Sequence, residues 1–148
     1  MSKTILLLNG PNLNLLGQRE PDIYGAKTLA DIEEECIKMA QDRGLTVYCE
    51  QRNGEGEMVE VIHDAMNKAD AIVINPGAYS HTSIALRDAL AGSDLPVYEI
   101  HISNIHARES FRHFSYISAL AEGVICGLGT RGYMFALQAA IKDLKDKK

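Results

Sequence analysis

The stretch from Ala71 to Ile102, AIVINPGAYSHTSIALRDALAGSDLPVYEIHI, predicts the fold of this chain. Residues 71–74 form a short apolar run typical of a buried strand, and residues 96–102 form a second β-rich run. Between them, residues 83–91 carry their apolar side chains at helical spacing. A strand, a helix and a strand in succession predict a βαβ unit, in which the two strands run parallel.

The same alternation continues on both sides of this unit. Further strands are predicted at residues 4–8, 45–49 and 123–126, and helical patterns at residues 29–40, 59–66, 131–144 and, in a shorter form, within 108–121. Thr28 is the expected N-cap of the first helix, and Gly44 stands just past its end. Five strands alternating with helices in 148 residues predict one α/β domain, residues 1–148, with a flavodoxin-like doubly wound five-stranded parallel sheet of order 2-1-3-4-5.

Composition and charge argue against several classes of protein. Apolar residues make up 46% of the chain, enough for a core, and the formal net charge is −5 with a pI of about 5.5. The acidic balance argues against a nucleic-acid partner, although a few arginines can still form a positive pocket for a small anion. The apolar run from Ile5 to Leu8 is too short for a signal peptide or a membrane span, so we expect no membrane association and a cytoplasmic location.

Cysteine and histidine usage predicts neither disulfides nor a metal site. The three cysteines, Cys36, Cys49 and Cys126, are far apart and form no C-x-x-C motif, so we expect reduced, buried thiols. No pair of the five histidines has ligand spacing together with a carboxylate.

Polar residues gather where the predicted strands end, the edge at which open α/β sheets bind ligands. They are Asn9-Gly-Pro-Asn-Leu-Asn14, Asn75-Pro-Gly-Ala-Tyr-Ser-His81, Glu99-Ile-His-Ile-Ser-Asn104 and, soon afterwards, Arg108-x-x-x-Arg112. The connection from residue 9 to residue 27 is unusually long and contains Arg19, Glu20 and Tyr24. A connection of this length in a small domain is often a lid, and we interpret it as one.

Missing motifs narrow the chemistry. The chain has no G-x-S-x-G, no P-loop, no G-x-G-x-x-G after a strand, and no lysine at the carboxyl end of a strand for a Schiff base. The glycine-rich run from Gly127 to Gly132 follows the last strand, so we expect it to serve packing and the turn into the last helix. Acid–base chemistry by tyrosine, histidine and arginine remains.

The residues suggest how such chemistry is divided. Tyrosine has an ordinary pKa of about 10, so Tyr24 needs nearby positive charge, such as Arg19 or Arg108, to act as a base near neutral pH. His101 is a natural proton donor, and Glu99 lies two residues earlier on the same strand face, where it can fix the imidazole tautomer.

Plainer interpretations stand beside these. Tyr24 could anchor its loop, His101 could be structural, Asn12 and Asn14 could form turns, and Asn75 could end a strand. Arg108 and Arg112, spaced one helical turn apart, could form a solvated face or hold an anion between them.

Three other functions are alternatives for a chain of this fold class. A flavodoxin-like mononucleotide binder lacks a phosphate loop here, since Pro11 removes a backbone donor, and a receiver domain needs aspartate where Asn75 stands. A catalytically inactive sensor of quinate-like ligands is a third alternative.

Three spaced motifs together resemble the type II 3-dehydroquinate dehydratases. They are NGPNLNLLGQREPDIYG at 9–25, NPGAYSHTSIALRD at 75–88, and EIHISN at 99–104 followed by RESFR at 108–112. The resemblance runs essentially from end to end. Ser80 departs from it, because the family more often has threonine there.

The resemblance implies a role for each matching residue. Tyr24 would be the base that removes a proton alpha to the ketone, with Arg19 and Arg108 stabilising its phenolate. His101, oriented by Glu99, would protonate the leaving hydroxyl. Asn12 would stabilise the enolate through a water. Asn75, Ile102 and Ser103 would bind the carboxylate. His81 and Arg112 would hold the ring hydroxyls, together with Asp88 from a neighbouring subunit.

The resemblance also implies the setting of the reaction. The family dehydrates 3-dehydroquinate to 3-dehydroshikimate by anti elimination through an enolate, and uses no metal or organic cofactor. It forms homo-oligomers, dodecamers built as four trimers, and serves shikimate biosynthesis, and hence aromatic amino acids, or quinate breakdown.

Overall fold

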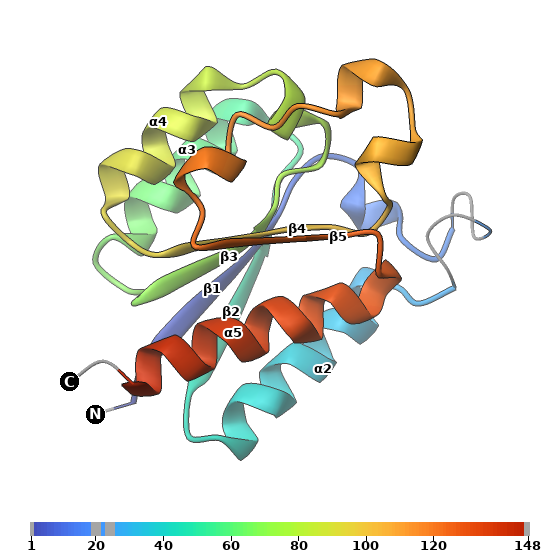
Figure 1. Ribbon diagram of the computed structural model, residues 1–148. Coiled ribbons are helices and arrows are strands. Elements are labelled where there is room, and N and C mark those ends of the chain that lie inside the picture. Colours follow the sequence, from blue (N-terminus) through green and yellow to red (C-terminus); the bar gives the residue numbers. More distant parts are fainter. Residues whose placement is uncertain (1, 19–21, 23–25, 147–148) are drawn as a thin grey trace.

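The central feature of the fold is a five-stranded parallel sheet. The computed structural model describes residues 2–18, 22 and 26–146. The strands are β1 (Thr4–Asn9), β2 (Thr46–Gln51), β3 (Ala71–Asn75), β4 (Val97–His101) and β5 (Gly123–Cys126), and their order is β2-β1-β3-β4-β5 (Figure 1). The predicted strand order is therefore confirmed.

Helices cover both faces of the sheet. α2 (Leu29–Asp42) and α5 (Gly132–Asp146) lie on one face, and α3 (Glu55–Ala65) and α4 (Ile84–Ser93) lie on the other (Figure 1). This is the doubly wound arrangement that the alternating pattern predicts.

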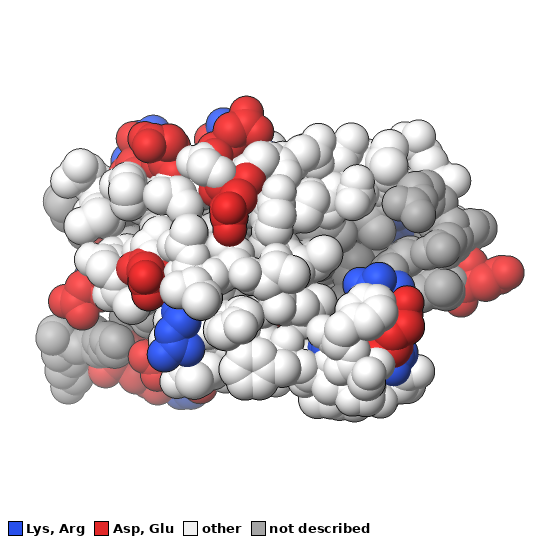
Figure 2. All heavy atoms as spheres, turned by 90° about the horizontal axis from the view of Figure 1, so that it is seen from above, with Lys and Arg blue, Asp and Glu red and all other residues white. Residues whose placement is uncertain are grey.

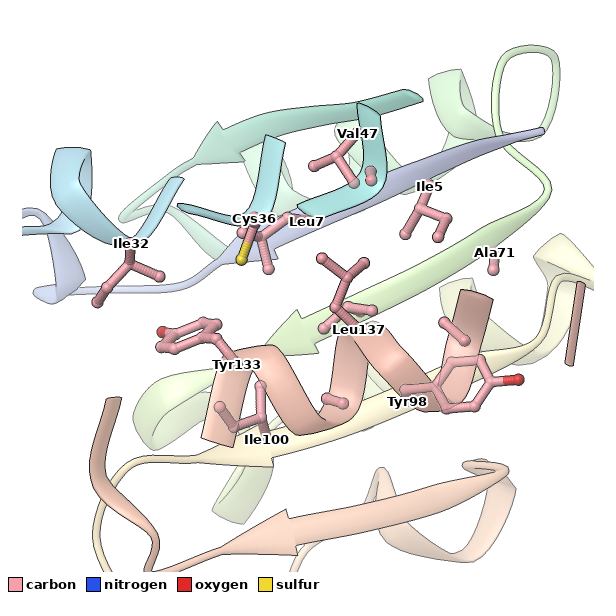
Figure 3. Packing of buried hydrophobic residues seen from close by; sticks show 14 of the residues in the cluster. Ile5, Leu7, Ile32, Cys36, Val47, Ala71, Tyr98, Ile100, Tyr133 and Leu137 are labelled. Atoms are coloured by element: carbon pink, nitrogen blue, oxygen red, sulfur yellow. The ribbon is translucent and has the colours of Figure 1, made fainter. Parts of the chain in front are cut away.

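Strand alternation divides the buried side chains into two clusters. In β1, Ile5 and Leu7 pack toward α2 and α5, whereas Leu6 and Leu8 pack toward α3 and α4. Figure 3 shows part of the first cluster, packed between the sheet and these helices. Because the central strands are buried on both faces, they appear in the sequence as unbroken apolar runs rather than as alternating ones.

The ends of the helices follow local chemistry. Thr28 caps α2 with a capping box, in which Asp31 Nα–H donates to Thr28 Oγ1 and Thr28 N–H donates to Asp31 Oδ2. Gly44 follows that helix with φ +80°, a conformation in which glycine has no steric cost. The predicted helix at 83–91 begins one residue later, because Ser83 is its N-cap and accepts from Leu86 N–H at 2.9 Å, and it continues to Ser93.

The connection after β4 does not contain the single short helix that the sequence predicts within residues 108–121. Three 3-10 helices occupy this region, η3 (Ile105–Ala107), η4 (Ser110–Arg112) and η5 (Ser118–Leu120). Arg108 lies between the first two in an extended conformation, with φ −105° and ψ −166°. The premise that Arg108 and Arg112 stand one turn apart on a helix is therefore wrong.

The structure describes part of the expected lid, and its helices can be compared with the length of a membrane span. The expected lid contains η1 (Leu13–Leu15), but its central part, residues 19–21 and 23–25, lies outside the described residues. Within the described part of the chain, the helices are all too short or too polar to cross a membrane.

Candidate active site

A cavity of about 430 Å³ lies at the carboxyl edge of the sheet. Many of its lining residues come from the segments that follow β1, β3 and β4, as expected for an open α/β sheet. The sequence-predicted site residues that line it are Asn12, Asn75, His81, His101, Ile102, Ser103, Arg108 and Arg112. Figure 2 views the side of α3 and α4, where acidic groups stand apart on a largely uncharged surface and the basic groups drawn form no continuous patch.

Glu99 and His101 form a buried pair on β4. Both side chains lie on the same face of the strand, and Glu99 Oε2 contacts His101 Nε2, as the sequence pattern predicts. Ser115 Oγ–H donates to Glu99 Oε2 at 2.8 Å, and Ser118 Oγ–H donates to Oε1 at 2.7 Å. Glu99 itself does not line the cavity and is completely buried behind His101.

The hydrogen bonds decide the charge of Glu99. Burial by itself raises the pKa of this carboxyl, but the hydrogen bond and charge of His101 and the bonds from Ser118 and Ser115 together outweigh burial, so the pKa is lowered from its ordinary value. An ionised carboxylate only accepts hydrogen bonds, so His101 Nε2 must carry a hydrogen. Nδ1 is then the imidazole nitrogen available for proton exchange with a ligand in the cavity.

His81 stands beside His101 on the cavity wall. The two rings are stacked, with centroids 6.1 Å apart and planes 20° apart. His81 Nδ1–H donates to the carbonyl of Phe114 at 2.8 Å, which leaves Nε2 as an acceptor. Burial, followed by the neighbouring positive groups of His101 and Arg112, lowers the pKa of His81 despite the bond to Phe114. This imidazole is therefore neutral at pH 7.

The two arginines of the cavity, Arg108 and Arg112, contact the carboxylate of Glu109, which lies between them in the sequence. Glu109 Oε1 lies 2.8 Å from Arg112 Nε and 3.9 Å from Arg108 Nε. Arg108 Nη1 also donates to Ser103 Oγ at 3.3 Å. The hydrogen bond from Arg112 is the main cause that lowers the pKa of Glu109. Glu109 lines the cavity and was missed from the sequence, where its only signal is its place between two arginines.

The side chain of Asn75 makes hydrogen bonds on both sides of its amide, so Asn75 does more than end β3. Its side chain is buried, its Oδ1 accepts from Gly77 N–H at 3.1 Å, and its Nδ2 donates to Tyr133 Oη at 2.8 Å. Tyr133 Oη–H in turn donates to Asn9 Oδ1 at 2.5 Å. Sequence reasoning gave Tyr133 no role at this edge of the sheet.

The loop after β1 is fastened from the end of β2. Asn12 has a left-handed backbone, with φ +70°, and its N–H donates to Asn53 Oδ1 at 3.0 Å. Gln51 Nε2 donates to the carbonyl of Gly10 and to Asn53 Oδ1, both at 3.0 Å. Asn12 is therefore a turn former, as the plainer interpretation has it, and it also lines the cavity. Nothing in the sequence of Gln51 or Asn53 signalled this contact.

Besides Glu99, one described site residue does not line the cavity, and two predicted site residues lie outside the described part of the chain. Asp88 is exposed on α4 and is not one of the lining residues. Arg19 and Tyr24 lie outside the described residues.

The thiols and metal-binding side chains offer no further site in the described part of the chain. No group of three or more histidine, cysteine or acidic side chains there could hold a metal ion. The cysteines are free, and Cys36 is buried whereas Cys49 and Cys126 are partly buried. Burial is the main cause that raises the pKa of Cys36 and of Cys49 to about 12, so both thiols are protonated and unreactive near neutral pH.

Comparison with known proteins gives one consistent result. Residues 3–141 match the model of the family described as dehydroquinase class II. The chain is 58% identical over 142 residues to a 3-dehydroquinate dehydratase of Psychromonas ingrahamii, with 96% of this chain and 95% of that protein covered. It is 56% identical over 138 residues to 3-dehydroquinate dehydratase 2 of Pseudomonas aeruginosa, with 93% of each chain covered.

A solved structure agrees with these sequence relatives. The crystal structure of the type II dehydroquinase from Propionibacterium acnes superposes with a TM-score of 0.91 at 48% identity, covering 97% of this chain and 99% of that one.

Proposed function

The chain belongs to the class II dehydroquinases, the type II 3-dehydroquinate dehydratases, and from this premise we propose how its residues remove water from 3-dehydroquinate. The dehydratase activity follows from membership of the family. The proposal is an anti elimination: a base removes the proton alpha to the ketone, an enolate forms, and an acid protonates the hydroxyl that leaves as water. The product is 3-dehydroshikimate.

His101 is the general acid in this proposal, and the observation that carries it is the buried Glu99–His101 pair at the cavity wall. The ionised carboxylate fixes the ring orientation and keeps a hydrogen on Nε2, which leaves Nδ1 to deliver the proton to the leaving hydroxyl. A lone surface histidine would have neither property.

The base must approach the substrate from the side opposite to His101. His81, the other imidazole at the cavity, is stacked against His101 on the same wall and therefore faces the same side of a bound ring. Glu109 is a weak base because Arg112 lowers its pKa. Tyr24, which the resemblance implies as the base with Arg19 beside it, is the assignment we propose.

The remaining polar groups bind the substrate in this proposal. Asn75, Ile102 and Ser103 receive the carboxylate, whose charge is complemented by Arg108, and Arg108 also adds positive charge near the Tyr24 phenolate. Asn12 stabilises the enolate through a water. His81 and Arg112 bind the ring hydroxyls, and the neutral Nε2 of His81 suits a hydroxyl hydrogen.

Asp88 enters the site from another subunit in the same proposal. Its exposed position on α4, away from the cavity of its own chain, is compatible with a contribution to a neighbouring cavity. The assembly would be a dodecamer of four trimers, with a role in shikimate biosynthesis or quinate breakdown.

The test follows the ultraviolet absorbance of the conjugated enone product with purified protein, 3-dehydroquinate and EDTA. A prompt rise that survives borohydride treatment with substrate is expected, because the proposed steps use neither a metal nor an imine.

The same assay then compares His101→Gln with His63→Gln, a control in an exposed histidine of α3. Removing a general acid is expected to lower kcat by about 10²- to 10⁴-fold, and the control is expected to keep wild-type activity. A folded His101→Gln enzyme with wild-type kcat would overturn the assignment of the acid.

A further inference from the structure

We propose that Tyr133 is a positioning residue, which fixes the side-chain amide of Asn75 so that one of its N–H groups faces the substrate. The inference rests on the proposed function, because the orientation of Asn75 matters to turnover only if Asn75 binds substrate. Tyr133 does not line the cavity and acts through its neighbour.

A chain of side-chain hydrogen bonds supports this role. Asn9 and Asn75 are register partners at the carboxyl ends of β1 and β3. Both side chains contact the hydroxyl of Tyr133, which lies in the first turn of α5. The hydroxyl donates to Asn9 Oδ1 at 2.5 Å and accepts from Asn75 Nδ2 at 2.8 Å. All three residues are buried, with Asn9 and Tyr133 fully enclosed and Asn75 only 3% exposed.

The directions of these bonds leave Asn75 a single orientation. A phenol has one hydrogen, and Asn9 Oδ1 takes it, so the Tyr133 oxygen can only accept from Asn75. At the other side of the amide, Gly77 N–H needs an acceptor and finds Asn75 Oδ1 at 3.1 Å. A flipped amide would lose both bonds. In the observed orientation one Nδ2 hydrogen bonds Tyr133 and the other is left for a ligand in the cavity.

The phenol stays in the protonated form that this network needs. Burial raises the pKa of Tyr133 and outweighs the opposing effect of the hydrogen bond with Asn75. Tyr133 therefore remains a donor to Asn9 over the whole pH range in which enzymes are usually assayed.

The side-chain amide of Asn9 is a second observation that supports the network. Among the described residues its Nδ2 finds no hydrogen-bond partner, although it is buried. An unsatisfied buried donor costs stability, and an apolar residue at this position would avoid that cost. The amide oxygen of Asn9 is what the phenol of Tyr133 requires.

The glycine-rich turn before α5 brings the phenol to this place. A Cβ on Gly132 would lie 3.2 Å from Ile100 Cδ1 and 3.4 Å from Ile125 Cγ2, so glycine allows the first turn of α5 to approach β4 and β5 closely. Gly127 and Gly129 have φ values of +88° and +68°, which the turn between β5 and α5 requires. The motif thus serves the site indirectly, by setting where Tyr133 enters the sheet edge.

Tyr98 offers a matched control within the same hydrophobic cluster. Its hydroxyl donates to Asp143 Oδ2 at 2.5 Å and, like Tyr133, it links the sheet to α5. Figure 3 shows the two tyrosines at opposite ends of the cluster, Tyr133 at the first turn of α5 and Tyr98 near its far end. Tyr98→Phe therefore removes a tyrosine hydroxyl from the same cluster at a distance from the cavity.

The experiment measures kcat, KM and the thermal midpoint for wild type, Tyr133→Phe, Tyr98→Phe and Asn75→Ala. Both phenylalanine variants are expected to lower the midpoint, since Tyr98→Phe loses one partly buried hydrogen bond and Tyr133→Phe loses two buried ones. Of these two variants, only Tyr133→Phe is expected to raise KM, by about tenfold, with kcat kept, because carboxylate binding contributes equally to the substrate complex and the transition state.

Each outcome bears on a different claim. If Asn75→Ala raises KM and Tyr133→Phe does not, the positioning role is wrong and the proposed function stands. If Asn75→Ala leaves KM unchanged, the proposed role of Asn75 fails and the inference falls with it. Equal rises of KM in Tyr133→Phe and Tyr98→Phe would show a general loss of structure and overturn the inference.

A second variant covers a failure of Tyr133→Phe to fold. Asn9→Leu keeps the phenol but removes the acceptor for its hydrogen, so the hydroxyl can turn toward Asn75 and no longer demands one orientation of the amide. A rise in KM with kcat kept would support the inference, and an unchanged KM in the folded variant would overturn it.

Discussion

Replacing Glu99 with glutamine is expected to lower kcat by about 5- to 12-fold while the protein remains folded. The substitution keeps a hydrogen bond to His101 but makes its acceptor neutral, and the difference between a charged and a neutral hydrogen bond is about 1–1.5 kcal/mol, where each 1.4 kcal/mol changes a rate by about tenfold. The charge of Glu99 strengthens the hydrogen bond that holds His101 in the orientation and tautomer needed in the proposed mechanism. The loss should therefore appear in kcat rather than in KM.

The surroundings of Glu99 make glutamine a conservative replacement. Oε2 receives both His101 and Ser115, so the single amide oxygen can take this place. The amide nitrogen then faces Ser118, whose hydroxyl can rotate to accept a hydrogen bond. The two donors to Oε2 keep their acceptor and only the partly buried Ser118 hydroxyl must redirect its hydrogen, which is why the loss is assigned to charge and not to misfolding.

The enone absorbance assay measures the effect, and Glu60→Gln on the exposed side of α3 serves as the control. Glu99→Gln is also combined with His101→Gln. If Glu99 acts only through His101, the double variant loses no more activity than His101→Gln alone. Near-normal kcat in Glu99→Gln, or losses that add fully in the double variant, would refute the reasoning.

Stability should report the same carboxylate through its dependence on pH. Although burial raises its pKa, hydrogen bonds to His101, Ser118 and Ser115 lower the pKa of Glu99 in the folded state overall. A carboxyl with a lowered folded pKa stabilises the protein above its unfolded pKa of about 4.3 and loses this contribution as the pH falls through the folded pKa. The free energy of unfolding of wild type minus that of Glu99→Gln, measured with urea, should therefore shrink on acidification. A difference that grows in acid would contradict the sign of the pKa shift.

Three further predictions address the base, the arginine pair and the thiols. Tyr24→Phe should abolish turnover while ligand binding, measured by calorimetry with the product, remains, and Arg19→Ala should lose nearly as much activity; a mere rise in KM would make Arg19 only a binding residue. Glu109→Gln removes the anion that the cavity arginines now contact, so KM for the anionic substrate should fall, most clearly at low salt, whereas a raised KM would mean that the carboxylate orients them. Cys36 and Cys49 should react with a thiol reagent only after unfolding, because burial raises the pKa of each to about 12, and rapid labelling of either in the native enzyme would contradict this.

The sequence by itself determined the sheet order and the edge at which the site lies. Both depend on features that act over a few residues: the period of apolar side chains, the cap at Thr28, and polar groups placed directly after strands. The pairing of Glu99 with His101 belongs here too, because two residues separated by one position on a strand share a face.

Only the tertiary structure decided which side chains support the site from a distance. Tyr133 meets Asn9 across 124 positions of sequence, and Ser115 and Ser118 reach Glu99 from a connection with no regular periodicity. The helical spacing expected for Arg108 and Arg112 failed at the same connection, because its 3-10 turns are set by tertiary contacts rather than by a repeating pattern. Periodicity encodes which face of an element is buried, but a hydrogen bond between distant segments depends on where packing brings them, and that is decided only when the helices close over the sheet.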